Sequence, residues 1–264
     1  MVEKLLDVID KAAGYLLTPF AYPGRFLPLL GLTFSKRSLV RELVHLTPHR
    51  KWYHTQKFTT ILDVGAYIGA YAFAMQHILP DAQVYSFEPL PASFATLQKN
   101  MQKFQRWQGF NTAVGESNGS LEFWQNDFSA SSSALPMEDL HRETFPQTEV
   151  SRKVNVTVAR LDDLAPELKL ISPVLLKIDV QGFELSVLRG AEEMLKQVDC
   201  VVCEVSYQLL YKGQASFSEV YQFMLQHGFT YQGSLENLVS PLDGSIMQSD
   251  AVFTRSTGSQ EYES

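Results

Sequence analysis

Two short stretches of the chain place acids and glycines at the ends of apolar runs. Residues 61–69 read ILDVGAYIG, which predicts a buried strand that delivers Asp63, Gly65 and Gly69 to a tight turn before a helix. Glycines there leave bare backbone against which an adenosine-bearing ligand can lie. Residues 83–89 read QVYSFEP and predict a second strand that ends in Glu88, where a βαβ unit places an acid beside ribose hydroxyls. Each feature alone is an ordinary turn glycine or helix-start acid, but their order predicts a nucleotide-type pocket.

The spacing of the glycines indicates which nucleotide fits. A dinucleotide-binding turn has the pattern GxGxxG, in which the backbone and the helix N-terminus receive a pyrophosphate. Here the pattern is DxGxxxG, and Tyr67 stands where the second glycine would be. A tyrosine side chain would crowd a diphosphate, whereas S-adenosylmethionine has no phosphate. The turn therefore favours S-adenosylmethionine, and an NAD-dependent oxidoreductase is the weaker alternative.

A later apolar run carries charged residues where chemistry is expected. Residues 174–184 read VLLKIDVQGFE, so Lys177 and Asp179 point to the same face of a predicted strand. Charges in a strand that is covered on both faces are costly unless they are paired or used. Because ligands bind beyond the carboxyl ends of parallel strands, Asp179 is a catalytic candidate. The alternative is that Lys177 only forms an ion pair with Asp179 or Glu184.

Two further acids accompany these charges. Glu184 is interpreted as a helix-start acid or a turn-stabilising acceptor, and Glu204, near the end of the next strand, as a second carboxylate that can reach the cleft. Asp179 and Glu204 are the only candidates for a divalent metal, and two carboxylates without a third ligand indicate one weakly. Methyl transfer to a hydroxyl needs an aligned acceptor oxygen and a base for its proton, and Asp179 can supply that base.

The elements that position these residues follow from the alternation of apolar runs and helical stretches after Thr59. The alternation predicts an α/β doubly wound fold with a mostly parallel seven-stranded sheet. Strands are expected near residues 59–65, 83–88, 109–114, 174–180 and 200–206, and helices near 69–79, 91–104, 184–195 and 216–227. An antiparallel C-terminal hairpin is expected from strands near 229–233 and 249–255.

One segment interrupts the alternation. Residues 115–160 hold the strand-like stretches GSLEFWQ and VNVTVAR on either side of a polar part that contains Ser129, Ser131, Ser132 and Ser133. A loop of this length is a candidate lid or substrate-binding insertion, and the alternative is a disordered surface excursion. The sequence favours neither of the two.

The first 57 residues are expected to be a helical extension that packs on a domain of residues 58–258, with a tail at 259–264. Leu5, Leu6, Ile9, Ala12, Ala13 and Leu16 fall on one helical face. Residues 15–34 are apolar but broken by prolines, so they do not predict a membrane span; packing on the core is favoured over weak membrane-surface contact. Lys36, Arg37, Arg41, Arg50, Lys51 and Lys57 form a basic patch that either steers an anionic substrate or is a solvated face.

Composition excludes several classes of protein. The chain has 22 Lys plus Arg against 29 Asp plus Glu, so its formal charge is -7. Non-specific electrostatic binding to the nucleic acid backbone is therefore not expected. Cys200 and Cys203 lie in the apolar run CVVCEVS and are interpreted as buried structural residues, not a redox pair. The first residues lack a signal-peptide pattern, which favours a cytoplasmic location.

The motifs together resemble one family. ILDVGAYIG, VYSFEPLP, NTAVGESNGSLEFW and above all LLKIDVQGFELSVLRGA resemble the FkbM-type methyltransferases, over about three quarters of the chain. Many class I, Rossmann-like methyltransferases share the first two motifs, whereas the KIDVQGFE block is specific. The resemblance implies an S-adenosylmethionine-dependent O-methyltransferase that acts on a hydroxyl of a sugar, a glycan or glycolipid, or a polyketide-like natural product.

The resemblance also implies roles for single residues. Asp63, Gly65, Ala66, Tyr67 and Gly69 would line the cofactor turn, Glu88 would hold the ribose, and Ala113 and Val114 would lie at the adenine side. Asp179 would stand at the methyl-transfer end, with Lys177 and Glu204 as the other catalytic candidates. A non-catalytic S-adenosylmethionine-binding or scaffold protein of the same fold is the alternative from another class. N-methylation is disfavoured because the chain has no NPPY-like turn.

Overall fold

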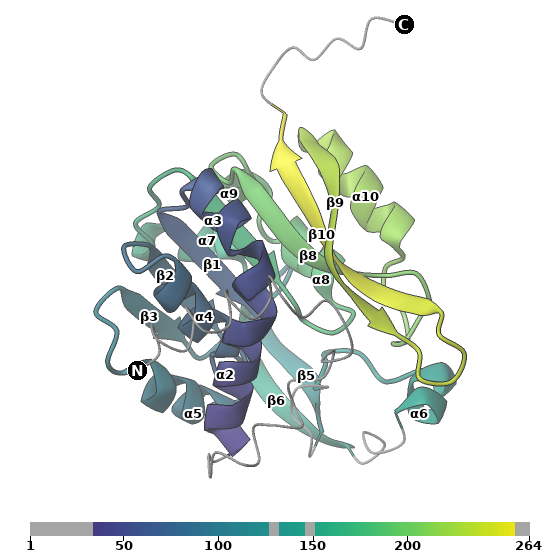
Figure 1. Cartoon of the computed structure of the whole chain (residues 1–264). Helices are drawn as coiled ribbons and strands as arrows, with labels where there is room; N and C mark the ends of the chain where they lie inside the picture. Colours follow the sequence, from purple (N-terminus) through teal and green to yellow (C-terminus); the bar gives the residue numbers. More distant parts are fainter. Residues whose placement is uncertain (1–33, 127–131, 146–150, 257–264) are drawn as a thin grey trace, which may run out of the picture.

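The computed structural model describes residues 34–126, 132–145 and 151–256 (Figure 1). Its centre is a seven-stranded sheet with the order β3-β2-β1-β7-β8-β10-β9. The strands are β1 (Thr60–Val64), β2 (Gln83–Phe87), β3 (Trp107–Phe110), β7 (Val174–Ile178), β8 (Cys200–Ser206), β9 (Phe229–Val239) and β10 (Ile246–Arg255). The first five are parallel, and β10 runs antiparallel to both β8 and β9. The predicted fold class is confirmed.

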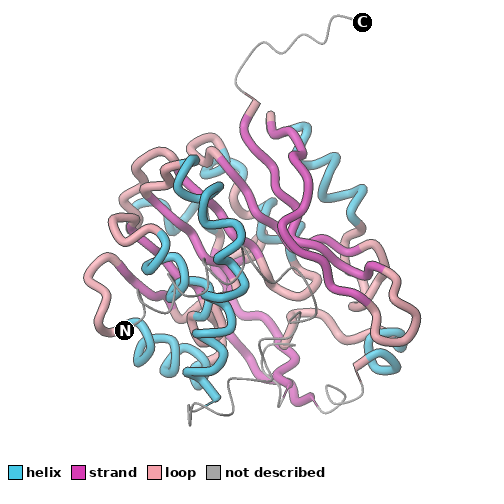
Figure 2. Tube along the Cα trace, viewed as in Figure 1, coloured by secondary structure: helices cyan, strands magenta, loops and turns pink. Residues whose placement is uncertain are grey.

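The central strands are buried because helices cover both faces of the sheet. Every residue of β1 and of β7 is buried, as expected for a parallel sheet whose strands are continuous apolar runs. One face carries α2 (Phe34–Leu46), the 3-10 helix η3 (Thr47–His49), α3 (Arg50–Gln56), α4 (Ala70–Ile78) and α5 (Pro91–Met101). The other carries α7 (Leu161–Leu164), the 3-10 helix η6 (Ala165–Glu167), α8 (Glu184–Arg189), α9 (Glu192–Leu195) and α10 (Phe217–Gln226). Figure 2 shows these helical layers around the strands.

Three predicted elements differ from the observed ones. The single helix expected at 184–195 is two, because the chain turns at Gly190, where a Cβ would lie 1.9 Å from the carbonyl oxygen of Gly115. The hairpin strands β9 and β10 are longer than expected. The residues that extend β9 beyond 233 are exposed or half-buried and lack the apolar pattern of the core strands, whereas Met247 and Gln248, which extend β10, are buried. The strand expected at 109–114 is divided between two sheets.

The second sheet explains that division. It has the order β4-β6-β5 and consists of β4 (Ala113–Val114), β5 (Gly119–Asn126) and β6 (Ser151–Ala159). Between β3 and β4, the side-chain amide of Asn111 donates to the carbonyl oxygens of Glu88 and Pro89, at 2.9 and 3.0 Å, and the chain leaves the main sheet. The strand-like stretches predicted in the 115–160 segment are confirmed as β5 and β6, and α6 (Asp139–Thr144) lies between them. Ser129 and Ser131 lie outside the described residues.

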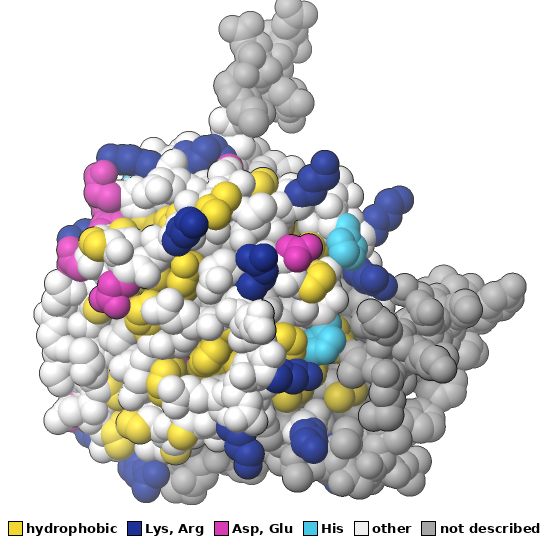
Figure 3. Space-filling view, turned by 90° about the vertical axis from the view of Figure 1, so that its left-hand side faces the viewer, with side chains coloured by type: hydrophobic (Ala, Val, Ile, Leu, Met, Phe, Trp, Pro, Cys, Tyr) yellow, Lys and Arg dark blue, Asp and Glu magenta, His cyan; other side chains and the backbone are white. Residues whose placement is uncertain are grey.

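The described part of the N-terminal extension packs on the main domain. Leu39, Leu43 and Leu46 of α2 are buried in the same core cluster as α4. The helical face expected at residues 5–16 lies outside the described residues, and the domain limits stay a prediction. Among the described residues, no helix is both long and apolar enough to cross a membrane. Figure 3 shows Lys and Arg side chains spread over the left-hand face of Figure 1, and both interpretations of the basic patch stay open.

The two cysteines lie where the sequence placed them. Cys200 and Cys203 are both on β8, buried and free. Burial raises the pKa of the Cys200 thiol to about 12, so the reactive thiolate is disfavoured. The prediction that both cysteines are buried is confirmed.

Candidate active site

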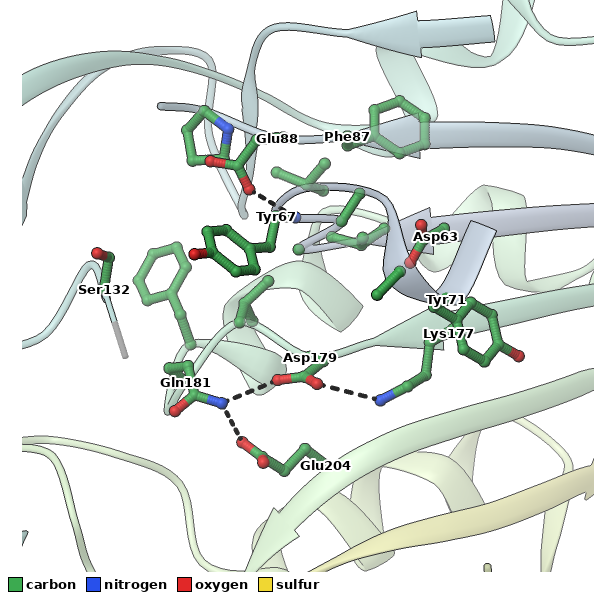
Figure 4. A pocket seen from close by; sticks show the side chains of 18 of the residues that line it. Asp63, Tyr67, Tyr71, Phe87, Glu88, Ser132, Lys177, Asp179, Gln181 and Glu204 are labelled. Carbon is green, nitrogen blue, oxygen red and sulfur yellow. Dashed lines mark hydrogen bonds and ion pairs between the residues drawn. The ribbon is translucent and has the colours of Figure 1, made fainter. Parts of the chain in front are cut away.

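A cavity of about 510 Å³ opens beyond the carboxyl ends of β1, β2, β7 and β8. Its size is in the range of small-molecule sites. The side chains that Figure 4 labels come from these strands and from the turns that follow them, with Tyr71 from α4 and Ser132 from the 115–160 segment. The cavity lining includes ten of the eleven predicted site residues: Asp63, Gly65, Ala66, Tyr67, Glu88, Ala113, Val114, Lys177, Asp179 and Glu204.

The turn between β1 and α4 lies directly against the end of β7. Gly65 has φ +85°, and a Cβ at this position would lie 1.8 Å from the carbonyl oxygen of Asp179. The backbone N–H groups of Gly65 and Ala66 both donate to the carbonyl oxygen of Phe87, at 3.0 Å. Because Gly65 has no Cβ, the turn after β1 can contact the backbone of Asp179 at the end of β7. The predicted cofactor turn and the predicted catalytic acid therefore lie side by side.

We expect Gly65→Ala to destabilise the protein more than Gly213→Ala. Both glycines have a similar positive φ, +85° and +76°, but a Cβ at Gly213 would meet nothing within 4 Å. The left-handed strain of about 1 to 3 kcal/mol is common to both variants, whereas the collision with Asp179 affects only the first. Urea unfolding measures both free energies. Equal losses of stability would show that the close approach of the two loops does not matter.

Gly69 does not line the cavity. It has φ +82° at the start of α4, and a Cβ there would lie 2.4 Å from a methyl carbon of Leu97 on α5. Its smallness therefore serves the packing of α4 against α5, and the cavity lining does not support the predicted cofactor contact. Tyr67 does line the cavity, with φ +49°, so the turn holds a non-glycine residue in the left-handed region.

Glu88 is buried at the end of β2 and fixes the turn that precedes α4. Its Oε2 accepts a hydrogen bond from the N–H of Tyr67 at 2.9 Å, and its Oε1 accepts one from the N–H of Leu90 at 2.8 Å. Burial raises the pKa of Glu88 to about 8, although the two backbone donors oppose this shift. Each carboxylate oxygen keeps a lone pair for a ligand hydroxyl.

Asp63 lies deeper, on β1. It is buried, it accepts a hydrogen bond from the Ser86 hydroxyl at 3.2 Å, and it pairs in register with Lys177 of β7. Burial raises the pKa of Asp63 to about 7, and the positive charge of Lys177 partly opposes the shift. The carboxyl therefore changes between its protonated and ionised forms near neutral pH.

We expect Asp63→Asn to weaken the dependence of stability on pH. Folded Asp63 holds a proton up to a pKa of about 7, while an unfolded aspartate releases it near its usual value of 3.8. This contribution to stability is complete below pH 3.8 and is lost as the pH rises through 7, at most about 4 kcal/mol. Urea unfolding at pH 4, 6 and 8 measures the slope, with Asp81→Asn at an exposed position as the control. A slope that Asp63→Asn leaves unchanged would contradict the expectation.

Lys177 is buried between two carboxylates. Its Nζ lies 3.1 Å from Oδ1 of Asp250 on β10 and 3.5 Å from Oδ2 of Asp179. Burial lowers the pKa of Lys177, but Asp250, Asp179 and Glu204 together outweigh it and raise the pKa well above its usual value. Of the two ion pairs that the alternative interpretation of Lys177 named, the one with Asp179 is present. The alternative pair with Glu184 is wrong, because Glu184 accepts hydrogen bonds from the N–H groups of Val180 and Gly182 and so stabilises the turn.

Gln181 joins the two catalytic candidates, and sequence reasoning missed it. Its Nε2 donates to Asp179 at 2.9 Å and to Glu204 at 3.1 Å, as Figure 4 shows, and its Oε1 accepts from the Tyr211 hydroxyl at 2.9 Å. The residue has φ +55°. Its neighbour Gly182 was the only signal of an unusual turn. Burial, and then the charges of Asp179 and Glu184, raise the pKa of Glu204 well above its usual value.

The donors around Asp179 and Glu204 do not fit a metal site. An ammonium and an amide N–H₂ point at these carboxylates, so hydrogen-bond donors stand where a cation would bind. Within the described ranges, no group of three or more His, Cys, Asp and Glu residues could hold a metal ion. The two carboxylates act instead as hydrogen-bond acceptors within the cavity.

The cavity also has walls outside the predicted site residues, and of these wall residues the sequence singled out only Arg41, as part of the basic patch. Ser38, Arg41, Glu42 and His45 of α2 line it, together with Glu236, Asn237 and Leu238 of β9 and Gln248, Ser249 and Asp250 of β10. The His45 imidazole contacts the carboxylate of Glu236, so α2 and β9 are joined. This hydrogen bond raises the pKa of His45, although burial opposes the shift. No local motif marks these residues, which only the packing of distant segments brings together.

The 115–160 segment forms another part of the lining. Leu121 and Phe123 of β5 and Ser132 and Ala134 after it line the cavity. The side chain of the buried neighbour Ser133 donates to the carbonyl oxygen of Gln181 at 2.5 Å. The described part of this segment is therefore packed against the site and is not a disordered excursion.

The sequence of the chain is similar to known methyltransferases. The family model described as "Methyltransferase FkbM domain" matches residues 63–231. The 2-O-methyltransferase NoeI of Sinorhizobium fredii is 31% identical over 160 residues, which cover 58% of this chain and 66% of that protein. The 31-O-demethyl-FK506 methyltransferase FkbM of Streptomyces tacrolimicus is 26% identical over 219 residues, which cover 75% of this chain and 79% of that protein.

A third relative is archaeal. The hexuronic acid methyltransferase AglP of Haloferax volcanii is 28% identical over 145 residues, which cover 54% of this chain and 54% of that protein. The match therefore spans about half of this relative's length and just under two thirds of that of NoeI.

Proposed function

Because the chain belongs to the FkbM methyltransferase family, we propose that it transfers the methyl group of S-adenosylmethionine to a hydroxyl of a sugar, a glycan or glycolipid, or a polyketide-like natural product. One observation carries the proposal. Asp179, the candidate base, directly adjoins the Gly65 turn, and both line one cavity beyond the carboxyl ends of the parallel strands.

The residues of the β1 and β2 ends fit S-adenosylmethionine. The bare backbone of Gly65 and Ala66 allows close approach of a ligand, and the Glu88 carboxylate can accept hydrogen bonds from the two ribose hydroxyls. Ala113 and Val114, both buried, offer a small apolar surface for the adenine. When bound, S-adenosylmethionine supplies an electrophilic methyl group on a sulfonium.

Asp179 is suited to take the proton of the acceptor hydroxyl. The Lys177 ammonium and the Gln181 amide donate to it, which fixes its orientation. Its side chain is 42% exposed, so a bound hydroxyl can reach it from the cavity. Glu204 lies beside Asp179 through the shared Gln181 amide, so its carboxyl group can hydrogen-bond to the acceptor while Asp179 accepts the proton.

The proposed chemical class of the acceptor is supported by the names of the relatives and by the residues that line the cavity. NoeI and FkbM are named for methylation of oxygen, and AglP for methylation of a hexuronic acid. The cavity walls beyond Asp179 are polar and carry several carboxyl groups, which hydrogen-bond to hydroxyls. These observations support an acceptor with several hydroxyl groups.

Isotope transfer tests the proposed function. The protein is incubated with S-adenosylmethionine that carries a tritiated methyl group and with a fractionated extract of small molecules and glycans. We expect tritium in at least one fraction, in a product whose methyl ether resists alkaline ester hydrolysis. Binding of S-adenosylhomocysteine without labelling of any fraction would favour a non-catalytic protein of the same fold. Tight binding of NADH with no binding of S-adenosylhomocysteine would favour an oxidoreductase.

A further inference from the structure

The two halves of the cavity come from different parts of the chain. The family model matches residues 63–231, which include the β1 and β2 ends, Asp179 and Glu204. Glu42 and His45 of α2 precede this region, and Glu236 and Asp250 of the hairpin follow it. The segments that flank the family domain therefore close the cavity on the side of Lys177.

Glu42 is the acid in this closing wall that has no partner. The structure gives its carboxyl no hydrogen bond to any described residue, although Asp250, Asp179 and Glu236 each contact a cationic side chain. The charged groups that act on its pKa are Glu236, His45, Lys177 and Asp250. A half-buried carboxyl that lines a cavity beside other acids, without a hydrogen-bond partner, costs stability, and such groups persist where a ligand binds them.

From this arrangement we propose that Glu42 binds a hydroxyl of the methyl acceptor, so that the α2 helix and the β9–β10 hairpin select the acceptor. The inference rests on the proposed function and adds the segments that decide specificity. The contact between the His45 imidazole and the Glu236 carboxylate joins α2 to β9. Glu42, one turn before His45 on α2, is thereby held at the cavity wall.

The protonation of Glu42 suits a hydroxyl ligand. Burial, and then the charge of Glu236, raises the pKa of Glu42 to about 7, while His45 and Lys177 oppose the shift. Near neutral pH the carboxyl is therefore divided between its two forms. A protonated carboxyl both donates and accepts hydrogen bonds, as a hydroxyl does, and the ionised form accepts from one.

Steady-state kinetics of two variants tests the inference. The probe is the extract fraction that the wild-type protein labels with tritiated methyl groups, applied in serial dilution at pH 8. We expect Glu42→Ala to raise the half-saturating amount of this fraction about tenfold or more, with the affinity for S-adenosylhomocysteine unchanged. Glu42→Gln keeps a donor and an acceptor and should lie between Glu42→Ala and the wild type. Glu192→Ala, at an exposed position on α9 outside the cavity, is the control.

Thermal unfolding separates binding from a structural role. A residue that mainly supported the fold would lower the melting temperature when replaced, whereas removal of the unpartnered Glu42 carboxyl should leave it unchanged or raise it at pH 8. A half-saturating amount for Glu42→Ala equal to that of the wild type would overturn the inference and leave the proposed function intact. A wild-type protein that labels no fraction would refute the proposed function, and the inference with it.

Discussion

Asp179→Asn lowers the turnover of methyl transfer by a factor of about 100 to 10,000, the usual contribution of a general base. The variant keeps the size of the side chain and can still hydrogen-bond to Lys177 and Gln181, but it cannot take up the proton of the acceptor hydroxyl. Because Asp179 touches the Gly65 turn through its backbone, the substitution should leave the affinity for S-adenosylhomocysteine nearly unchanged. Single-turnover transfer of tritiated methyl groups measures the rate, and calorimetry measures the affinity.

The control for this prediction is the neighbouring carboxyl group. Glu204→Gln keeps the size of the side chain and can still accept a hydrogen bond from Gln181, and Asp179 remains as the base, so its turnover should fall much less than that of Asp179→Asn. If both variants lose turnover equally, the assignment of the base to Asp179 is wrong. If neither loses more than about tenfold, alignment without base catalysis accounts for the reaction.

Glu88→Ala weakens binding of S-adenosylhomocysteine by a factor of about 100 or more. Hydrogen bonds to a charged group contribute about 1.5 to 3 kcal/mol each, and the ribose offers two hydroxyls. The variant also leaves the N–H groups of Tyr67 and Leu90 without their acceptor, which loosens the turn that precedes α4. Calorimetry of the wild type, Glu88→Ala and the exposed control Glu192→Ala tests this expectation.

The raised pKa of Glu88 adds a pH dependence to the same measurement. The carboxyl has a pKa of about 8 in the free protein, and ribose hydroxyls that donate to it favour its ionised form. Affinity should therefore increase as the pH rises from 6 to 8, with release of a proton on binding, and Glu88→Ala should abolish this dependence. A wild-type affinity that does not change with pH would show that the ribose does not interact with Glu88.

The sequence predicted well which residues of the β1 and β2 ends line the cavity, because their signals are local. The strand that ends in Asp63, the glycine that follows and the acid at Glu88 belong to two consecutive strand-turn-helix units, in which spacing and residue type decide the geometry. The parallel order of the strands then brings Asp179 to the same edge of the sheet. Glu184 was also interpreted correctly, since a turn acid is held by backbone groups two and four residues away.

The interpretation of Gly69 was not supported for a physical reason. A glycine in a turn can serve a ligand or a neighbouring helix, and the sequence does not distinguish the two. Contact with Leu97, 28 positions later in the chain, decides that Gly69 serves the packing of α5. The division of the expected strand at 109–114 likewise depends on hydrogen bonds of Asn111 to a distant loop.

The sequence by itself determined the doubly wound sheet, the family and the residues that line the cavity at the ends of β1 and β2, since apolar period, turn glycines and motif order act over short distances. Only the tertiary structure decided how the acceptor side is closed. Glu42 and Glu236 are separated by almost the whole domain, and Lys177 meets Asp250 across β8. Such contacts depend on how α2 and the C-terminal hairpin pack on the finished sheet, and no local pattern in the sequence encodes that packing.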